Sequence, residues 1–329
     1  WQNGRKHPSP SKKCSNLPQR AMKRFVGNLL CVLLSAGAIL LALTGWQVSE
    51  INRVSWKLRP DTHMIVFGPS TTGSTLSEEY LSRFQNLSRN ASYLSQLVSL
   101  LPKLLDENPN IDTVLINHGR FQLILAEDKE NLQLMRSIRE ALPFIYSDLE
   151  HQDWKEILGR KNFYGALFTP NLEQMITTNY TNITDFVNGH TDVFGCNLEN
   201  HFKWYDRHVK EHGGTQWTKE WILKNCSSNH RWTLRAMQIC REHGVVPVLF
   251  FSPVYNYDRW IEIDGLVELM KDYPPQTLIA DYEDFAFPDS TYFLDVHHLN
   301  GHGAKYISSH IDKNGLQVQS LQTWLAAHE

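Results

Sequence analysis

The sequence predicts an α/β domain with a parallel, doubly wound sheet, carried on one N-terminal transmembrane helix. Three observations support this prediction. Short apolar runs alternate with helical patterns from residue 63 to the C-terminus, which is typical of parallel strands joined by helices. One membrane-length run near the N-terminus contains no charged residue. An aromatic-rich stretch, about residues 147–230, interrupts the alternation, and we expect it to form an inserted cap.

The charge distribution separates the N-terminus from the rest of the chain. The chain has 329 residues, of which 42% are hydrophobic and 20% are charged, and this is the composition of a globular protein. Residues 1–49 carry seven Lys or Arg and no acid, which leaves 25 basic and 35 acidic residues in the remainder. The net charge of −3 therefore hides a body with a balance of −10. A body this acidic is not expected to bind nucleic acid.

The apolar run from Phe25 to Trp46 is the predicted transmembrane helix, between a basic cytoplasmic tail (1–24) and a linker (47–62). Its 22 uncharged residues are enough to cross a hydrocarbon core of about 30 Å. Because the basic residues precede it, the positive-inside rule keeps the N-terminus in the cytoplasm and exports the body. A cleaved signal peptide is the alternative, although its apolar core is normally shorter, about 7 to 15 residues.

The body, residues 63–329, contains five apolar runs with the length of strands. These are Met64–Phe67, Phe84–Leu87, Thr113–Ile116, Val245–Phe251 and Leu278–Asp281. Helical patterns occupy four further stretches. One begins at Leu76, and the other three cover residues 93–105, 132–146 and 302–312. The alternation of the two kinds of segment predicts a single α/β domain with the cap inserted into it.

Tryptophans gather in and beside the predicted cap. Trp204, Trp217 and Trp221 are the predicted substrate-binding residues, because an indole ring can stack on a sugar ring. The alternative is that they form the small apolar core of the cap itself.

Three cysteines lie in the body, at positions 196, 226 and 240. They show no CxxC spacing, which excludes a zinc ribbon. One disulfide with one free thiol fits their number, and the candidate pairs join Cys226 to Cys240 or to Cys196.

A histidine-rich stretch near the C-terminus contains the predicted base. Asp295 and His298 stand three apart, at the end of an apolar run and the start of a helical pattern. That spacing lets the carboxylate hold the imidazole, as in the base half of a nucleophilic triad. Two alternatives stay open: a solvated turn, or a metal site on His297, His298 and His302. The preferred interpretation, a base for a serine nucleophile, requires no metal and no cofactor.

Ser70 is the predicted nucleophile. It follows the first strand in a Gly-Pro-Ser turn that leads into a helix. This position exposes a hydroxyl at a helix N-terminus, where backbone N–H groups can stabilise an oxyanion. The competing interpretation is an ordinary helix N-cap. Ligands of doubly wound sheets bind at the carboxyl ends of strands, and Asn117 and Ser252 follow strands as Ser70 does.

Several short motifs resemble blocks of the GDSL/SGNH hydrolase superfamily. Residues 68–70 (Gly-Pro-Ser) resemble block I, with Pro where Asp is usual, and residues 86–92 (Asn-Leu-Ser-Arg-Asn-Ala-Ser) resemble block II. Residues 117–119 (Asn-His-Gly) stand where block III has its Gly-X-Asn, and residues 295–303, with Asp-X-X-His-Leu-Asn, resemble block V. Residues 252–254 (Ser-Pro-Val) also look like a subgroup of membrane-anchored bacterial envelope proteins.

The resemblance implies a flavodoxin-like SGNH fold and acyl transfer. Ser70 would attack an ester with His298 as base and Asp295 as its partner, while Ser70, Ser88 and Asn117 would form the oxyanion hole. Water as acceptor gives an esterase, and a sugar hydroxyl gives an O-acyltransferase. The expected substrate is an acylated polysaccharide or glycan of a bacterial periplasm or envelope. The alternative, favoured by the departures in blocks I to III, is a catalytically inactive module that binds glycans or assembly partners.

Overall fold

The structure is a computed structural model that describes the chain in several stretches. They are residues 17–51, 53–89, 94, 98, 100–120, 181–186, 203, 206, 217–225, 227–255 and 261–328. The chain divides into two compact units, residues 1–49 and 50–329, and each is described by itself. The helix predicted over 132–146 and most of the predicted cap lie outside the described residues.

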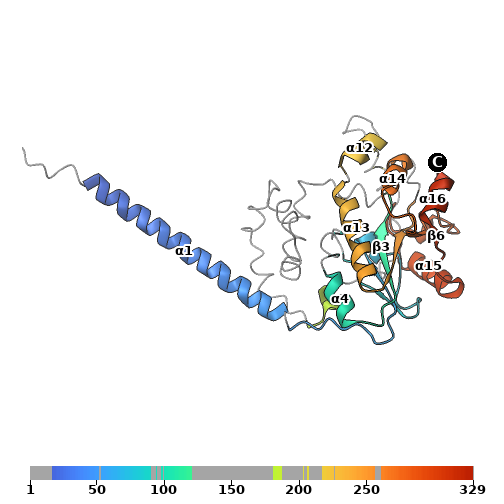
Figure 1. The fold of residues 1–329 in the computed structure, drawn as a ribbon, viewed down its shortest axis with the longest axis horizontal. Coiled ribbons are helices and arrows are strands. Elements are labelled where there is room, and N and C mark those ends of the chain that lie inside the picture. Colours follow the sequence, from blue (N-terminus) through green and yellow to red (C-terminus); the bar gives the residue numbers. More distant parts are fainter. Residues whose placement is uncertain are drawn as a thin grey trace, which may run out of the picture. The chain divides into compact units, whose positions relative to one another are not determined.

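The N-terminal unit is formed by the long helix α1 (Leu17–Ile51), drawn in blue in Figure 1. Its segment Ala21–Ile39 has a mean hydropathy of 1.4, and none of that segment is buried. Large apolar side chains such as Phe25 and Leu34 are 68% and 71% exposed. Among the described residues, α1 is the helix long and apolar enough to cross a membrane, either as an anchor or as a signal sequence.

The body is built on a six-stranded sheet, which confirms the predicted α/β class. Its strands are β1 (Met64–Phe67), β2 (Phe84–Asn86), β3 (Thr113–His118), β4 (Val246–Phe251), β5 (Leu278–Asp281) and β6 (Gln319–Ser320). The order is β2-β1-β3-β4-β5-β6, with β1 to β5 parallel and β6 antiparallel to β5. The five parallel strands thus have the flavodoxin-like order. Their apolar composition fits their burial, since every residue of β1, β3 and β4 after the first one or two is buried.

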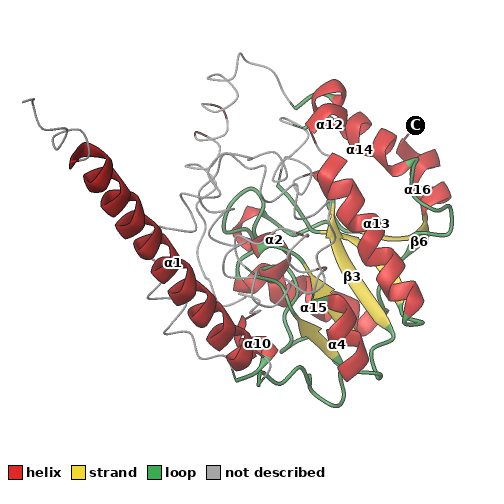
Figure 2. Cartoon of the chain, turned by 60° about the vertical axis from the view of Figure 1, so that its left-hand side comes forward, coloured by secondary structure: helices red, strands yellow, loops and turns green. Residues whose placement is uncertain are grey.

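Helices cover both faces of this sheet. The helices of the body among the described residues are α2 (Ser70–Gly73), α4 (Leu101–Glu107), α10 (Ile183–Phe186), α12 (Lys219–Asn225), α13 (Ser227–Glu242), α14 (Ile263–Met270), the 3-10 helix η2 (Ser290–Tyr292), α15 (Gly301–Asn314) and α16 (Leu321–His328). Figure 1 shows α4 and α13 on one side of β3 and α15 on the other, and Figure 2 shows α4 and α13 together in front of the strands. Helices α12 and α13 begin inside the segment predicted as the cap, yet α13 packs on β3 and β4 and α12 packs on α14.

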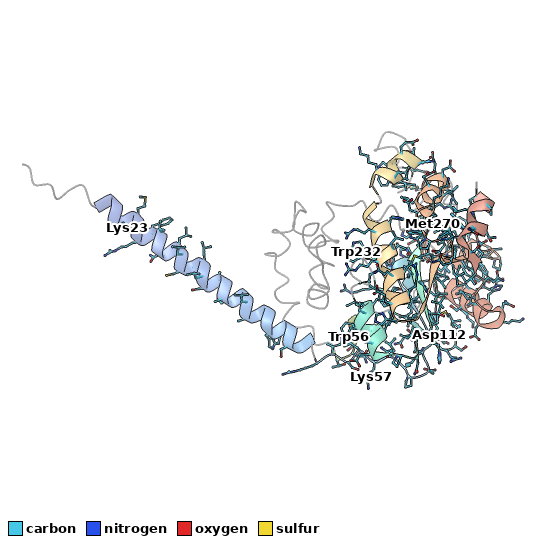
Figure 3. The ribbon with its side chains drawn as sticks, in the orientation of Figure 1. Lys23, Trp56, Lys57, Asp112, Trp232 and Met270 are labelled. Carbon is cyan, nitrogen blue, oxygen red and sulfur yellow. The ribbon has the colours of Figure 1, made fainter. Side chains whose placement is uncertain are left out.

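The segment predicted as a linker belongs partly to the body. Val54, Trp56 and Leu58 are buried in the main hydrophobic core, at 6%, 5% and 8% exposure. Their alternation with exposed residues has the period of a strand, so their burial covers one side of an extended chain. Trp56 lies against α4, where the Lys103 ammonium sits 4.6 Å from the centre of its ring (Figure 3). Residues 47–51 lie in α1, and the chain from Val54 onward is packed in the body, so most of the predicted linker belongs to one unit or the other.

Cys240 is a free, fully buried thiol in α13. Burial raises the pKa of this thiol to about 12, so it stays protonated at neutral pH. Of the two candidate pairs, the one that joins Cys226 to Cys240 is not formed in the structure, where Cys240 is a free thiol. Cys196 and Cys226 lie outside the described residues.

Candidate active site

The turn after β1 presents Ser70 as the first residue of α2. Pro69 occupies the N-cap position, and the chain bends so that the Gly73 N–H donates to Pro69 O at 3.0 Å. Ser70 is therefore not the cap itself, and its hydroxyl is directed to another residue. The helix predicted to start at Leu76 is not present: residues 74–83 form turns and loop, and the short helix α2 ends before them, at Gly73.

Gly68 lets β3 approach this turn closely. A Cβ at Gly68 would lie 2.6 Å from the Cβ of Asn117 and would also collide with the hydroxyl of Thr72. Glycine is needed here for space, because no side chain fits between the turn and the neighbouring strand. The absence of a side chain brings Asn117 next to the residues that precede Ser70.

His298 joins Ser70 to Asp295. Its Nε2 lies 2.7 Å from the Oγ of Ser70, and its Nδ1 lies 2.9 Å from Oδ2 of Asp295. The hydrogen bond predicted between Asp295 and His298 is thus confirmed. These contacts fit a neutral imidazole that carries its proton on Nδ1, donates it to the carboxylate, and accepts from the serine hydroxyl at Nε2.

The backbone of the same loop fixes Asp295. Its Oδ1 accepts from the N–H groups of His297 and His298, at 3.0 and 2.9 Å. The Nδ1 of His297 is farther away, at 3.6 Å, so His298 rather than His297 occupies the position of the base. Burial alone would raise the pKa of Asp295, but the His298 hydrogen bond and the charges of both histidines hold this pKa well below its ordinary value. The carboxylate is therefore ionised at neutral pH.

Asn300 anchors the loop to the start of α15, a role that the sequence reasoning missed. Its Oδ1 accepts from the N–H groups of His302 and Gly303 at 3.0 and 3.1 Å, as an N-cap does. Its side-chain amide donates to Thr291 O at 2.7 Å, and its backbone N–H donates to Tyr292 O at 3.1 Å. An asparagine directly before a helical pattern is the sequence signal that could have identified it.

Asn117 is the last residue but one of β3 and lies 2% exposed beside the nucleophile turn. Its Nδ2 donates to the Oγ of Ser252 at 2.9 Å, so the hydroxyl after β4 fixes the orientation of the amide. The predicted oxyanion donor Ser88 is placed differently. Its backbone N–H already donates to Oδ1 of Asn86 at 3.0 Å, and the residue is fully buried. Ser88 could serve an oxyanion only if this internal bond were broken.

A small cavity of about 10 Å³ lies between the carboxyl ends of β3, β4 and β5. It is lined by Thr71, Asn117, His118, Gly119, Ser252, Val254 and Glu283. Most of its lining residues are polar, and the Oγ1 of Thr71 and the Nδ1 of His118 have no hydrogen-bond partner among the described residues. Burial, with a smaller contribution from the charge of His230, lowers the pKa of His118 to about 3, so this imidazole is neutral at pH 7.

A buried ion pair closes the back of this cavity. The Nε of Arg120 lies 2.7 Å from Oε2 of Glu283, and the Arg120 N–H donates to Oε1 at 2.8 Å. Gly119 has a φ of +126°, and a Cβ there would lie 2.6 Å from Oε1. Burial raises the pKa of Glu283, and the Arg120 charge opposes that rise. The pair was not predicted, and it joins the loops that follow β3 and β5.

Two of the three tryptophans predicted to stack on a sugar, Trp217 and Trp221, lie in the described part of the chain, and both pack against the core of the body. Trp217 and Trp221 contact each other edge to face, with ring centres 6.5 Å apart, and both pack against the main core while half-buried. Trp217 also pairs with Ile261 through its backbone. This favours the alternative of a structural role, although each ring keeps an exposed part. Trp204 lies outside the described residues.

The alternative metal site has a different set of ligands from the expected one. Donor atoms of Asp295, His297 and His298 lie within 4.8 Å of one another, whereas His302 is not part of this group. The same Asp295 and His298 atoms are already joined by hydrogen bonds to each other and to Ser70. The structure thus brings Ser70, His298 and Asp295 together in one chain of hydrogen bonds and does not assemble the three predicted histidines.

Neither a scan against protein-family models nor a search of curated proteins finds a match to this chain.

Proposed function

We propose that the body is an SGNH-type serine esterase or O-acyltransferase. The observation that carries this proposal is the continuous hydrogen-bonded chain from Ser70 through His298 to Asp295, with links of 2.7 and 2.9 Å. A serine hydroxyl is a weak nucleophile by itself, and an imidazole within hydrogen-bonding distance is what activates it. The strand order and the position of the serine after β1 also agree with the resemblance to the SGNH superfamily.

The proposed reaction has two acyl-transfer steps. The Nε2 of His298 takes the proton from Ser70 as Oγ attacks the ester carbonyl, and Asp295 stabilises the imidazolium that forms. Collapse of the tetrahedral intermediate breaks the bond to the alcohol oxygen, which takes the proton from His298, and leaves an acyl-Ser70. Water or a sugar hydroxyl then gives its proton to His298 and attacks this acyl group. The second tetrahedral intermediate then collapses: the bond between the acyl carbon and Oγ breaks, and Oγ takes the proton back from His298. The products are an acid or a new ester, together with free Ser70.

The Ser70 N–H and the Asn117 amide are the proposed oxyanion donors. The N–H groups of the first residues of a helix have no partner within that helix, and Ser70 opens α2. Asn117 lies beside the same turn and is held by Ser252. One such donor is worth about 3 kcal/mol of transition-state stabilisation. Because the Ser88 N–H is bonded to Asn86, we do not include Ser88 in this proposal.

The proposed location is the outside of the cytoplasmic membrane, with an acylated envelope polysaccharide or glycan as substrate. The support is the apolar run of α1 that starts at Phe25, which follows seven basic residues and has an exposed apolar surface. A reporter that is active only outside the cytoplasm, fused after residue 329, should be active. Activity of a cytoplasm-only reporter at the same position would reverse the topology.

The alternative function is a catalytically inactive module that binds glycans or assembly partners. The observation that favours it is the bond from Ser88 to Asn86, which leaves fewer oxyanion donors than the superfamily pattern implies. A fluorophosphonate probe separates the two functions, because it labels an activated serine covalently. We expect labelling of the full-length chain, loss of labelling in Ser70→Ala, and unchanged labelling in Ser74→Ala, whose hydroxyl donates to Thr71 O instead. A folded, unlabelled wild-type chain would establish the inactive module.

A further inference from the structure

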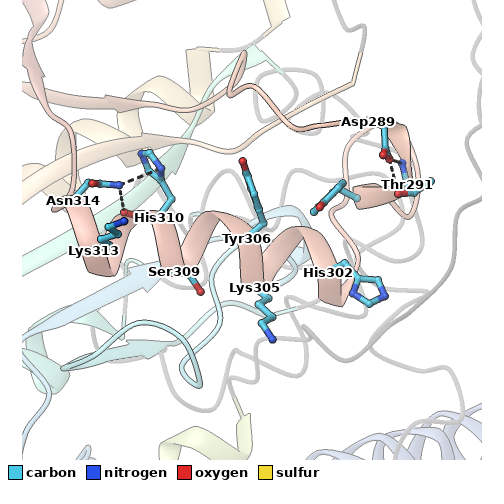
Figure 4. A pocket seen from close by; sticks show the side chains of 10 residues that line it. Asp289, Thr291, His302, Lys305, Tyr306, Ser309, His310, Lys313 and Asn314 are labelled. Carbon is cyan, nitrogen blue, oxygen red and sulfur yellow. Dashed lines mark hydrogen bonds between the residues drawn. The ribbon is translucent and has the colours of Figure 1, made fainter.

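The exposed face of α15 forms one wall of a second, larger groove of about 700 Å³ (Figure 4). His302, Lys305, Tyr306, Ser309, His310 and Lys313 line it along the helix. Their spacings of one and three residues place them on a single helical stripe. The turn that contains η2 adds residues 289, 291 and 292 at one end. A groove of this volume is large enough for a ligand of several sugar rings.

The charge of the groove is opposite to that of the body. Lys305 and Lys313 are both on its lining, and two histidines accompany them. Asp289 is the one acid among the described lining residues, and its carboxylate already accepts from the N–H and hydroxyl of Thr291. The body as a whole has a balance of −10. A local cationic strip on an acidic body attracts an anionic ligand and orients it along the helix.

Two tyrosine rings also line the groove, beside the lysines and histidines. Tyr306 is 41% exposed, and its ring centre lies 5.3 Å from that of Tyr292 in an edge-to-face contact. Phe287 contacts both rings, with its ring centre 5.7 Å from that of Tyr292 and 5.8 Å from that of Tyr306. A ring held in this way presents a fixed apolar face and a hydroxyl without further loss of side-chain freedom, which suits a sugar ring.

The groove is linked to the candidate active site through Asn300. This residue follows His298 by two positions, accepts from the N–H of His302, and donates to the backbone of Thr291 and Tyr292. His302, Thr291 and Tyr292 all line one end of the groove. A polymer lying along α15 would therefore have one end beside the loop that carries the base.

We propose that this groove binds an acidic glycan, a chain of sugar rings that bears carboxylate or phosphate groups. Lys305 and Lys313 contact the anionic groups, and Tyr292 and Tyr306 contact the ring faces. The assignment of this glycan as the substrate rests on the proposed function, whereas the binding itself does not.

Binding can be measured without turnover in the full-length Ser70→Ala chain, purified in mild detergent. The probes are oligogalacturonate, which carries a carboxylate on every ring, and a neutral maltooligosaccharide of equal length. We expect binding of the acidic probe alone, weakened about tenfold or more when Lys305→Gln and Lys313→Gln are combined. Tyr306→Ala should also weaken it. A charge-matched control combines Lys57→Gln and Lys224→Gln, two exposed lysines that do not line the groove, and should change the affinity less than twofold.

Three results would overturn the groove assignment: no binding of the acidic probe, equal binding of the neutral probe, or an equal loss in both double variants. Fluorophosphonate labelling of the wild-type chain, compared with acidic-glycan binding by the Ser70→Ala chain, separates this inference from the proposed function. Labelling without glycan binding rejects the groove and leaves the serine enzyme. Glycan binding without labelling rejects the enzyme and leaves the groove as the site of a binding module.

Discussion

Replacement of Glu283 by glutamine tests the buried ion pair behind the candidate active site. Glu283 is 4% exposed and Arg120 is 2% exposed, and two hydrogen bonds of 2.7 and 2.8 Å join them. Gln has nearly the same shape, so the change removes the negative charge and one acceptor without opening a cavity. Loss of one partner of a buried pair costs about 3 to 5 kcal/mol, because the remaining guanidinium stays buried without its counter-charge. We therefore expect the free energy of unfolding to fall by about that amount.

The assay is urea unfolding of the full-length chain in mild detergent, followed by tryptophan fluorescence at pH 7. The matched control is Asp284→Asn, the same chemical change one residue later on an exposed side chain, which should alter the free energy of unfolding by less than about 0.5 kcal/mol. A loss below about 1 kcal/mol for Glu283→Gln, or equal losses for the two variants, would refute the reasoning. Either result would mean that the Arg120 charge is stabilised without Glu283.

Three further predictions concern the groups around the nucleophile. The folded chain protonates His118 only near pH 3, whereas the unfolded chain does so near its ordinary value of 6.5, so stability should fall as the pH drops through this window; His118→Phe should flatten that slope in urea unfolding. Asp295→Asn should slow fluorophosphonate labelling by up to about 10⁴-fold, since it removes the acceptor that fixes the His298 tautomer. Ser252→Ala should slow ester hydrolysis about tenfold at unchanged KM, because it releases the Asn117 amide, and Ser252→Thr should restore the rate.

Each of these predictions has a result that contradicts it. An unchanged pH slope in His118→Phe would place the acid sensitivity elsewhere. Labelling of Asp295→Asn at the wild-type rate would show that His298 needs no partner. Equal rates of ester hydrolysis in both Ser252 variants, whether reduced or unchanged, would show that the Ser252 hydroxyl does not act by orienting the Asn117 amide.

The sequence predicted the parallel strands and the contact between Asp295 and His298, because both depend on residues that are close together in the chain. The five parallel strands are short apolar runs, and the structure places them within one or two residues of the predicted ends. The contact between Asp295 and His298 spans three residues, so their spacing alone indicated it. The alternation of Val54, Trp56 and Leu58 was an available signal for a buried extended segment, although the region was assigned as a linker.

Contacts between residues far apart in the chain could not be predicted in this way. Arg120 and Glu283 are separated by 163 positions, and Asn117 and Ser252 by 135. Each pair meets because β3, β4 and β5 are neighbours in the sheet, and single-sequence patterns do not give the register of those strands. The internal bond from Ser88 to Asn86 is short-range, but a side chain that satisfies a nearby N–H leaves no periodic pattern.

The central claim is that Ser70 forms a covalent acyl-enzyme, and mass spectrometry of the digested protein tests it most directly. The full-length chain is mixed briefly with a chromogenic acetyl ester, quenched in acid, and digested to locate the acetyl group. The account predicts a burst of alcohol release equal to the amount of protein, with the acetyl group on the peptide that carries Ser70, and neither event in Ser70→Ala. Hydrolysis that persists in Ser70→Ala, or an acetyl group found on another residue, would contradict it.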